Sequence, residues 1–164
     1  MKQADIENRL RLTGEPQMLS FAAKMADVLV GGGLIFLEGT LGAGKTTLSR
    51  GLIQAMGHHG PVKSPTYTLV EEYNLEGQRV CHFDLYRLGD PEELEYMGIR
   101  EYLTDGTLCL IEWPERGRGV LPEPDLLIHI DDAGEARILN WQAQTDKGVQ
   151  WGRQLQQLIK EWQG

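Results

Sequence analysis

The fold is decided by residues 38–47, whose sequence is EGTLGAGKTT. They fit the phosphate-binding pattern G-x-x-x-x-G-K-[ST], with Gly39, Gly44, Lys45 and Thr46 at its four fixed positions. Glycines let a backbone turn tightly and approach an anion, and the amide N–H groups of such a turn form a concave anion site. We therefore expect Lys45 to reach the β- and γ-phosphates of a nucleotide and the Thr46 hydroxyl to ligate Mg²⁺.

The surroundings of this loop agree with the pattern. Residues 34–37 are a short apolar run, as expected of a buried strand. After the loop, apolar residues recur at helical spacing until Gly57. A glycine-rich turn with an incidental lysine, which is the alternative, would not require a strand before it and a helix after it. The nucleotide-binding residues predicted on this basis are Gly42, Ala43, Gly44, Lys45, Thr46 and Thr47.

Length and composition favour one globular domain over residues 1–164, because the chain has 164 residues of which 41% are apolar and 24% charged. The net charge of −8 argues against a protein that grips nucleic acid by itself, and the longest basic cluster is only Arg116-Gly117-Arg118. No apolar run approaches the ~18 residues of a membrane helix, and the start lacks the apolar segment of a secretory signal. We therefore expect a cytoplasmic protein, with Cys81 and Cys109 as buried, reduced thiols.

The pattern along the chain predicts a mixed α/β sheet, with parallel strands in the middle, antiparallel hairpins at the edges and helices around it. The expected segments are an edge strand within 1–14, a helix from Glu15, hairpin strands at 67–73 and 79–85 around a turn at 74–77, helices from Asp90 and over 99–103, strands at 107–111, 125–130 and 136–145, and a helix at the C-terminal end. His129 lies within an apolar strand and is expected to be a core residue.

A phosphate-binding loop of this kind needs a carboxylate near Mg²⁺, at the end of an apolar strand. Glu112 follows the apolar residues 107–111 and is the better candidate. Asp84 follows 80–83, which fit a buried strand less well because they include His82. Glu112 could instead be a helix cap or a surface acid, and aspartate is the more usual residue in this role.

Two further observations concern the nucleotide. Thr66 lies in Ser64-Pro65-Thr66, between the helix that follows the loop and the next strand, where a hydroxyl can reach Mg²⁺ or the γ-phosphate. On residue type alone this segment is equally compatible with an ordinary turn. The chain contains no N-K-x-D sequence, which disfavours a Ras-like GTPase and leaves ATP as the expected nucleotide.

Taken together, these segments resemble the TsaE (YjeE) family, whose members are small ATPases of bacterial tRNA threonylcarbamoyladenosine synthesis. The resemblance covers roughly residues 15 to 137. It rests on the loop at 39–47 and on four later blocks in a fixed order, VKSPTYTLVE (62–71), HFDLYRL (82–88), PEELE (91–95) and IEWPE (111–115). The loop alone is generic, whereas the four blocks at these intervals are specific to the family.

The resemblance implies a P-loop fold with antiparallel strands added to the sheet. It implies that Glu112 is the acid associated with Mg²⁺, that Thr66 belongs to a switch-like segment, that Asp84 is a second functional acid and that Trp113 is a functionally sensitive aromatic residue. One departure from the family is Met18, in the segment that enters the first helix, where members often place a small polar residue near the adenine.

The resemblance also implies a role and partners. The role is hydrolysis of ATP, slow in isolation and stimulated by partners, that drives or resets the complex forming the threonylcarbamoyl group on adenosine 37 of tRNAs that read codons starting with A. The implied partners are the catalytic subunit of that transferase and its inactive paralogue. Contact with tRNA would be indirect or weak, and no membrane is involved.

As a mechanism we expect Thr46 and Glu112 to hold the metal and Asp84, with Thr66, to orient the attacking water. Asp84 could instead pair with Arg87 across the hairpin, and Trp113 could be a core residue or lie over the site. The main alternative function is a small-molecule or nucleoside kinase, for which the arginines at 116–118 would be a sparse lid. A third possibility is a nucleotide-gated scaffold in which binding matters more than turnover.

Overall fold

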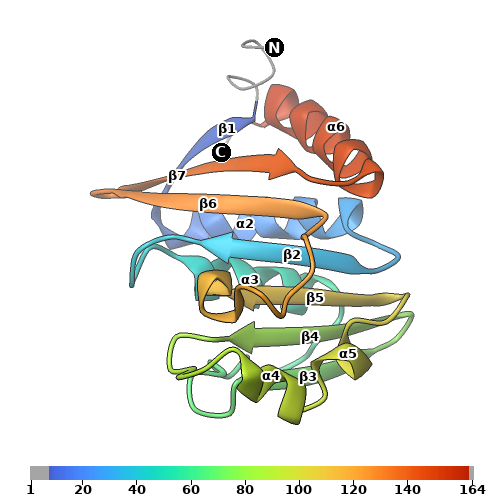
Figure 1. Ribbon diagram of the computed structural model, residues 1–164. Coiled ribbons are helices and arrows are strands. Elements are labelled where there is room, and N and C mark those ends of the chain that lie inside the picture. Colours follow the sequence, from blue (N-terminus) through green and yellow to red (C-terminus); the bar gives the residue numbers. More distant parts are fainter. Residues whose placement is uncertain (1–7, 163–164) are drawn as a thin grey trace.

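The computed structural model describes residues 8–162 (Figure 1). The strands are β1 (Arg9–Thr13), β2 (Gly33–Glu38), β3 (Val70–Leu75), β4 (Gln78–Asp84), β5 (Thr107–Glu112), β6 (Leu126–Ala133) and β7 (Ala136–Ala143). The helices are α2 (Gly14–Val28), α3 (Lys45–Ala55), α4 (Glu92–Tyr96), α5 (Ile99–Tyr102) and α6 (Asp146–Glu161), and η1 (Pro114–Gly117) is a 3₁₀ helix. The edge strand expected within 1–14 is β1, and the rest of that expectation, residues 1–7, lies outside the described residues.

All seven strands form one sheet in the order β1-β7-β6-β2-β5-β4-β3. The neighbours β6-β2, β2-β5 and β5-β4 are parallel, whereas β3-β4 and β6-β7 are antiparallel hairpins. This arrangement confirms the predicted mixed sheet with parallel strands in its middle. Because β2, β5 and β4 run in the same direction, the loop after β2 lies at the same edge of the sheet as Glu112 and Asp84, which pair in register.

Helices cover both faces of the sheet (Figure 1). On one face α2, α3 and α6 bury apolar residues against the strands, with Ile35, Leu110 and Ile128 among those fully buried. On the other face α4, α5 and η1 cover a smaller core around Phe83 and Ile111. No helix within the described residues is long and apolar enough to cross a membrane.

The switch-like segment is less extended than its aromatic and β-branched residues predicted. The hairpin strand β3 begins at Val70 and not at residue 67, because Leu69 has a left-handed φ of 71° and its N–H donates to the Pro65 carbonyl at 2.7 Å. Its partner β4 ends at Asp84, close to the prediction. The segment therefore forms a turn and leaves Tyr67 81% exposed.

The prediction for His129 is wrong. Its neighbours Ile128 and Ile130 are fully buried, and side chains alternate along a strand, so the imidazole points to the opposite face. There it is 41% exposed and lies 2.9 Å from Asp131. Cys81 and Cys109 are buried free thiols on neighbouring strands, as expected.

Candidate functional site

The phosphate-binding loop has the geometry that its glycines predict. Gly44 caps α3 in a left-handed conformation, with a φ of 114°. At Gly39 a Cβ atom would lie 2.6 Å from the Ile130 carbonyl oxygen, so only glycine fits without displacement. The loop connects the end of β2 to the start of α3, so the first N–H groups of α3 lie at the carboxyl ends of the parallel strands, where they can bind an anion.

Lys45 lies at the start of α3, only 4% exposed. Its Nζ atom donates to the carbonyl oxygens of Gly39 and Thr40 and stands 4.1 Å from the ring centroid of Trp113. Burial lowers the pKa of the Lys45 ammonium group, and the negative charges of Glu112 and Asp84 oppose that shift. The lysine is thus held at the loop by weak acceptors, and a phosphate would be a stronger partner for it.

The carboxylate of Glu112 meets the loop from the end of β5. Glu112 is 2% exposed, and the Thr46 hydroxyl lies 3.1 Å from each of its carboxylate oxygens. The buried His82 approaches the same carboxylate, with Nε2 2.7 Å from Oε2. This burial contradicts the alternative that Glu112 is a surface acid, and the residue that caps η1 is Trp113 and not Glu112.

Asp84 is the second acid at this edge, and its contacts differ from the hairpin pairing considered above. One carboxylate oxygen accepts from the Thr66 hydroxyl at 3.0 Å and the other from the Tyr86 N–H at 3.0 Å. Arg87 does not pair with it. The guanidinium group instead donates to the Tyr67 hydroxyl at 3.1 Å and stacks on that ring.

These groups line one cavity of about 210 Å³. Its lining includes Gly42, Gly44, Lys45, Thr46, Thr47, Ser64, Thr66, Asp84, Glu112 and Trp113. Of the predicted nucleotide-binding residues, Ala43 is wholly buried and does not line it. Residues from four separate segments of the chain therefore converge here, as a site for a phosphate group and its counterion requires.

The oxygen donors in this cavity fit Mg²⁺. A hydroxyl and two carboxylates are hard ligands of the type that Mg²⁺ prefers. Within residues 8–162 no group of three or more His, Cys, Asp or Glu side chains is arranged to hold a metal ion. Thr46 and Glu112 alone would leave the ion incompletely ligated, as is usual for Mg²⁺ that binds together with phosphates and water.

Trp113 stands between the site and the surface. It has a left-handed φ of 58°, is half-buried, and packs on Tyr86 with ring centroids 4.9 Å apart. The guanidinium of Arg116 lies 5.7 Å from the centroid of the Tyr86 ring. Trp113 therefore lies over Lys45. Of the two positions considered from the sequence, a core residue or a residue over the site, the structure has the second.

A second cavity adjoins the first and was not predicted. It has a volume of about 450 Å³ and shares Gly42, Gly44 and Thr47 with the phosphate cavity. Its other lining residues come from the start of α2 and from the β6–β7 hairpin: Gly14, Glu15, Met18, Gly134, Glu135 and Arg137. The departure noted at Met18 was the one signal for it, because that residue lies in its wall.

Comparisons with known proteins agree with this geometry. A sequence model of the family described as threonylcarbamoyl adenosine biosynthesis protein TsaE matches residues 12–139. The chain belongs to the TsaE family. A TsaE protein from Haemophilus influenzae, described as a tRNA threonylcarbamoyladenosine biosynthesis protein, is 55% identical over 139 residues, which cover 82% of this chain and 88% of that one.

Other members of the TsaE family support the same assignment. The TsaE protein of Bacillus subtilis is 41% identical over 113 residues, which cover 69% of this chain and 66% of the relative. The crystal structure of YdiB from Bacillus subtilis superimposes with a TM-score of 0.76 at 29% identity, and covers 91% of this chain and 93% of that one. The similarity confirms the P-loop type of fold over nearly the whole described chain.

Proposed function

We propose that this chain is the ATP-hydrolysing subunit of the machinery that forms threonylcarbamoyladenosine at adenosine 37 of tRNAs reading codons that start with A. The observation that carries the proposal is the convergence of Lys45 and Thr46 with Asp84 and Glu112 in one cavity. The name of the relatives supplies the pathway. The whole chain, 1–164, would act as one ATPase domain in the cytoplasm.

The two adjoining cavities together match the parts of ATP. The phosphates would occupy the smaller one, with Lys45 at the β- and γ-phosphates and the N–H groups of residues 42–47 around them. The base and ribose would occupy the larger one, between Met18 and Arg137. The guanidinium of Arg137 lies 3.5 Å from the Gly42 carbonyl oxygen and also pairs with Asp132 of its own hairpin, so it would stand at the rim of this space.

Thr46 and Glu112 would hold Mg²⁺. The ion, when bound, neutralises charge on the β- and γ-phosphates. Asp84 and Thr66 orient the attacking water, because the Thr66 hydroxyl fixes the Asp84 carboxylate at the edge of the same cavity. Lys45 stabilises the charge of the transferred group. Positioning and electrostatic stabilisation are the main protein contributions to this reaction, so no strong base is required.

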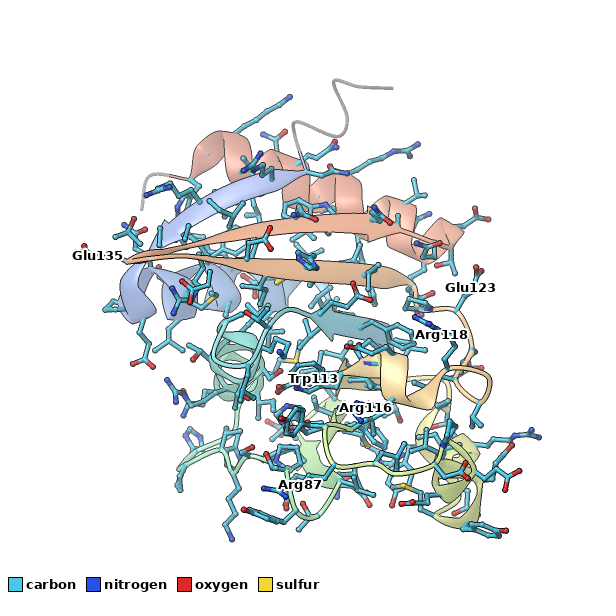
Figure 2. All side chains as sticks on the ribbon, turned by 60° about the vertical axis from the view of Figure 1, so that its left-hand side comes forward. Arg87, Trp113, Arg116, Arg118, Glu123 and Glu135 are labelled. Atoms are coloured by element: carbon cyan, nitrogen blue, oxygen red, sulfur yellow. The ribbon has the colours of Figure 1, made fainter. Side chains whose placement is uncertain are left out.

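The partners would be the transferase catalytic subunit and its inactive paralogue, and the chemistry on tRNA would belong to them. Figure 2 shows Arg87, Arg116 and Arg118 on the same face of the molecule as Trp113. Within residues 8–162 none of these guanidinium groups forms an ion pair, and Arg87 and Arg116 stack on tyrosines. These arginines could pair with acidic side chains of a partner, and Glu115 and Glu123 line the same hollow as Arg118. With a net charge of −8, contact with tRNA itself would be minor.

Turnover of ATP by the full-length chain tests the site. We expect release of phosphate without any added acceptor, and its loss in Lys45→Ala. The matched control is Lys147→Ala, which removes a lysine that lines a cavity at the other end of the parallel strands and should leave turnover unchanged. Turnover in Lys45→Ala equal to wild type would refute the assignment of the phosphate site.

Two further measurements separate the alternatives. Transfer of labelled γ-phosphate to a small acceptor would support the kinase. The 3₁₀ helix η1 is not a free lid, since Gly117 at its end is buried against Leu94 and Leu121. Asp84→Asn, combined with the two partner subunits and tRNA, tests the scaffold. We expect this variant to bind ATP and to fail to support repeated rounds of modification, whereas normal modification would favour the scaffold.

A further inference from the structure

One buried polar residue of the site has no part in the mechanism above. His82 lies in β4 on the face that packs against α3, and its side chain is 0% exposed. Its Nε2 atom lies 2.7 Å from Glu112 Oε2. Within the described part of the chain, its other ring nitrogen, Nδ1, has no hydrogen-bond partner.

The direction of this hydrogen bond follows from the two groups. An ionised carboxylate can only accept, so Nε2 of His82 is the donor to Glu112, and in the neutral imidazole Nδ1 then keeps a lone pair. A buried acceptor without a partner opposes folding. The rest of this part of β4 is apolar or neutral, with Val80, Cys81 and Phe83 fully buried. An apolar residue would fill this position without that penalty, so the histidine is better explained by its effect on Glu112.

The contacts of Glu112 show what that effect is. The Thr46 hydroxyl lies 3.1 Å from both carboxylate oxygens and so does not distinguish between them. His82 approaches only Oε2, from the neighbouring strand, and therefore fixes the rotation of the carboxylate. Among residues 8–162, Oε1 has no donor besides the Thr46 hydroxyl. Hydrogen bonds to a metal-binding carboxylate from a second residue orient it and strengthen metal binding.

We propose that His82 is a positioning residue for the magnesium site, which holds the Glu112 carboxylate in the orientation that receives the ion beside Thr46. The proposal rests on the proposed function, because it requires MgATP in this cavity. A purely structural role for His82 has a different consequence. It would make substitutions lower the melting temperature without changing how strongly Mg²⁺ promotes nucleotide binding.

The test compares two amides of different length. His82→Gln can place its amide nitrogen where Nε2 lies and still donate to Glu112, whereas the shorter His82→Asn cannot reach it. The dissociation constant of ADP is measured by titration calorimetry of the full-length chain, once with excess Mg²⁺ and once with EDTA. The dissociation constant in EDTA divided by that in Mg²⁺ reports how strongly the metal promotes binding, and it does not depend on turnover.

We expect the ratio to fall by about 10- to 100-fold in His82→Asn, with ADP binding in EDTA close to wild type, and to stay within about threefold of wild type in His82→Gln. Val80→Ala is the control, because it removes buried atoms from the same face of β4 without contact to Glu112. If His82→Asn does not fold, His82→Leu, which fills a similar volume and has no donor, takes its place.

The outcomes separate the two proposals. A wild-type ratio in a folded variant without the donor would overturn the role of His82, as would a wild-type chain whose ADP affinity does not depend on Mg²⁺. A wild-type chain that binds no ADP in either condition would instead overturn the proposed function. Equal losses in His82→Gln and His82→Asn would show that the imidazole does not act through its donor, and would overturn the proposal.

Discussion

Replacement of Gly51 by alanine tests how closely the position of the proposed nucleotide site depends on helix packing. Gly51 lies in the middle of α3, where that helix crosses α2. A Cβ atom at this position would lie 2.6 Å from Ala22 Cβ and 3.2 Å from Leu19 Cδ2. Ordinary contact begins near 3.4 Å, so the two helices would have to separate by about 1 Å.

Two effects of opposite sign decide the result. Alanine favours helix over glycine by about 1 kcal/mol. Overpacking a close contact between buried atoms costs about 1–3 kcal/mol. The free energy of unfolding should therefore fall by up to about 2 kcal/mol, which for a chain of this length lowers the melting temperature by about 4–8 °C. Because α3 starts at Lys45, the same displacement should weaken ADP binding.

Thermal melting and ADP titration of Gly51→Ala check both effects. The control is Gly152→Ala in α6, where the nearest atom to the added Cβ is 3.9 Å away and the helix preference should act alone, raising stability by about 1 kcal/mol. Ala22→Gly should relieve Gly51→Ala in the double variant, because it removes the opposing Cβ. The reasoning is refuted if Gly51→Ala is stabilised as much as Gly152→Ala.

Three other outcomes are expected. Trp113→Phe should lose the change in tryptophan emission on addition of MgADP, because Trp113 lines the phosphate cavity, and an undiminished change would contradict this. Burial lowers the pKa of Lys45 below 10.5, so between the lowered value and 10.5 the unfolded chain binds more protons than the folded chain. As the pH rises toward 10.5, unfolding experiments should therefore show wild type gaining stability relative to Lys45→Met. Gly148→Ala should destabilise the chain strongly in chemical denaturation, because its Cβ would overlap the Asp125 carbonyl oxygen, and native-like stability would show that α6 shifts freely.

Local sequence was sufficient for the parts of the site that lie on one segment. The loop at 38–47 and the acid after an apolar strand follow from spacing and residue type, and the structure brings both to one cavity. The contact of His82 with Glu112 depends on the register of β4 against β5. From the sequence alone, His82 was only a reason to regard residues 80–83 as a less typical buried strand. Arg137 reaches the loop from 95 residues away, which no local pattern reveals.

The orientation of side chains in apolar strands was also beyond the sequence. Residues 126–130 include four apolar side chains, so the alternation that turns His129 outward is hidden by Leu127, which lies on the same face as the histidine. The start of β3 was misplaced for a related reason. Its aromatic and β-branched residues favour a strand, but a backbone turn closed by the Leu69 N–H takes precedence.

The two hairpins of the sheet have a consequence for local opening of the molecule. The β3–β4 hairpin ends at Asp84 in one cavity, and the β6–β7 hairpin contributes Gly134 and Arg137 to the other. Peripheral elements open more often than the core in native-state fluctuations. The proposed nucleotide would contact both hairpins and would therefore suppress both openings by the same mass-action factor. Amide hydrogen exchange should therefore slow in the two hairpins together, while helix α6, which borders neither cavity, exchanges at an unchanged rate.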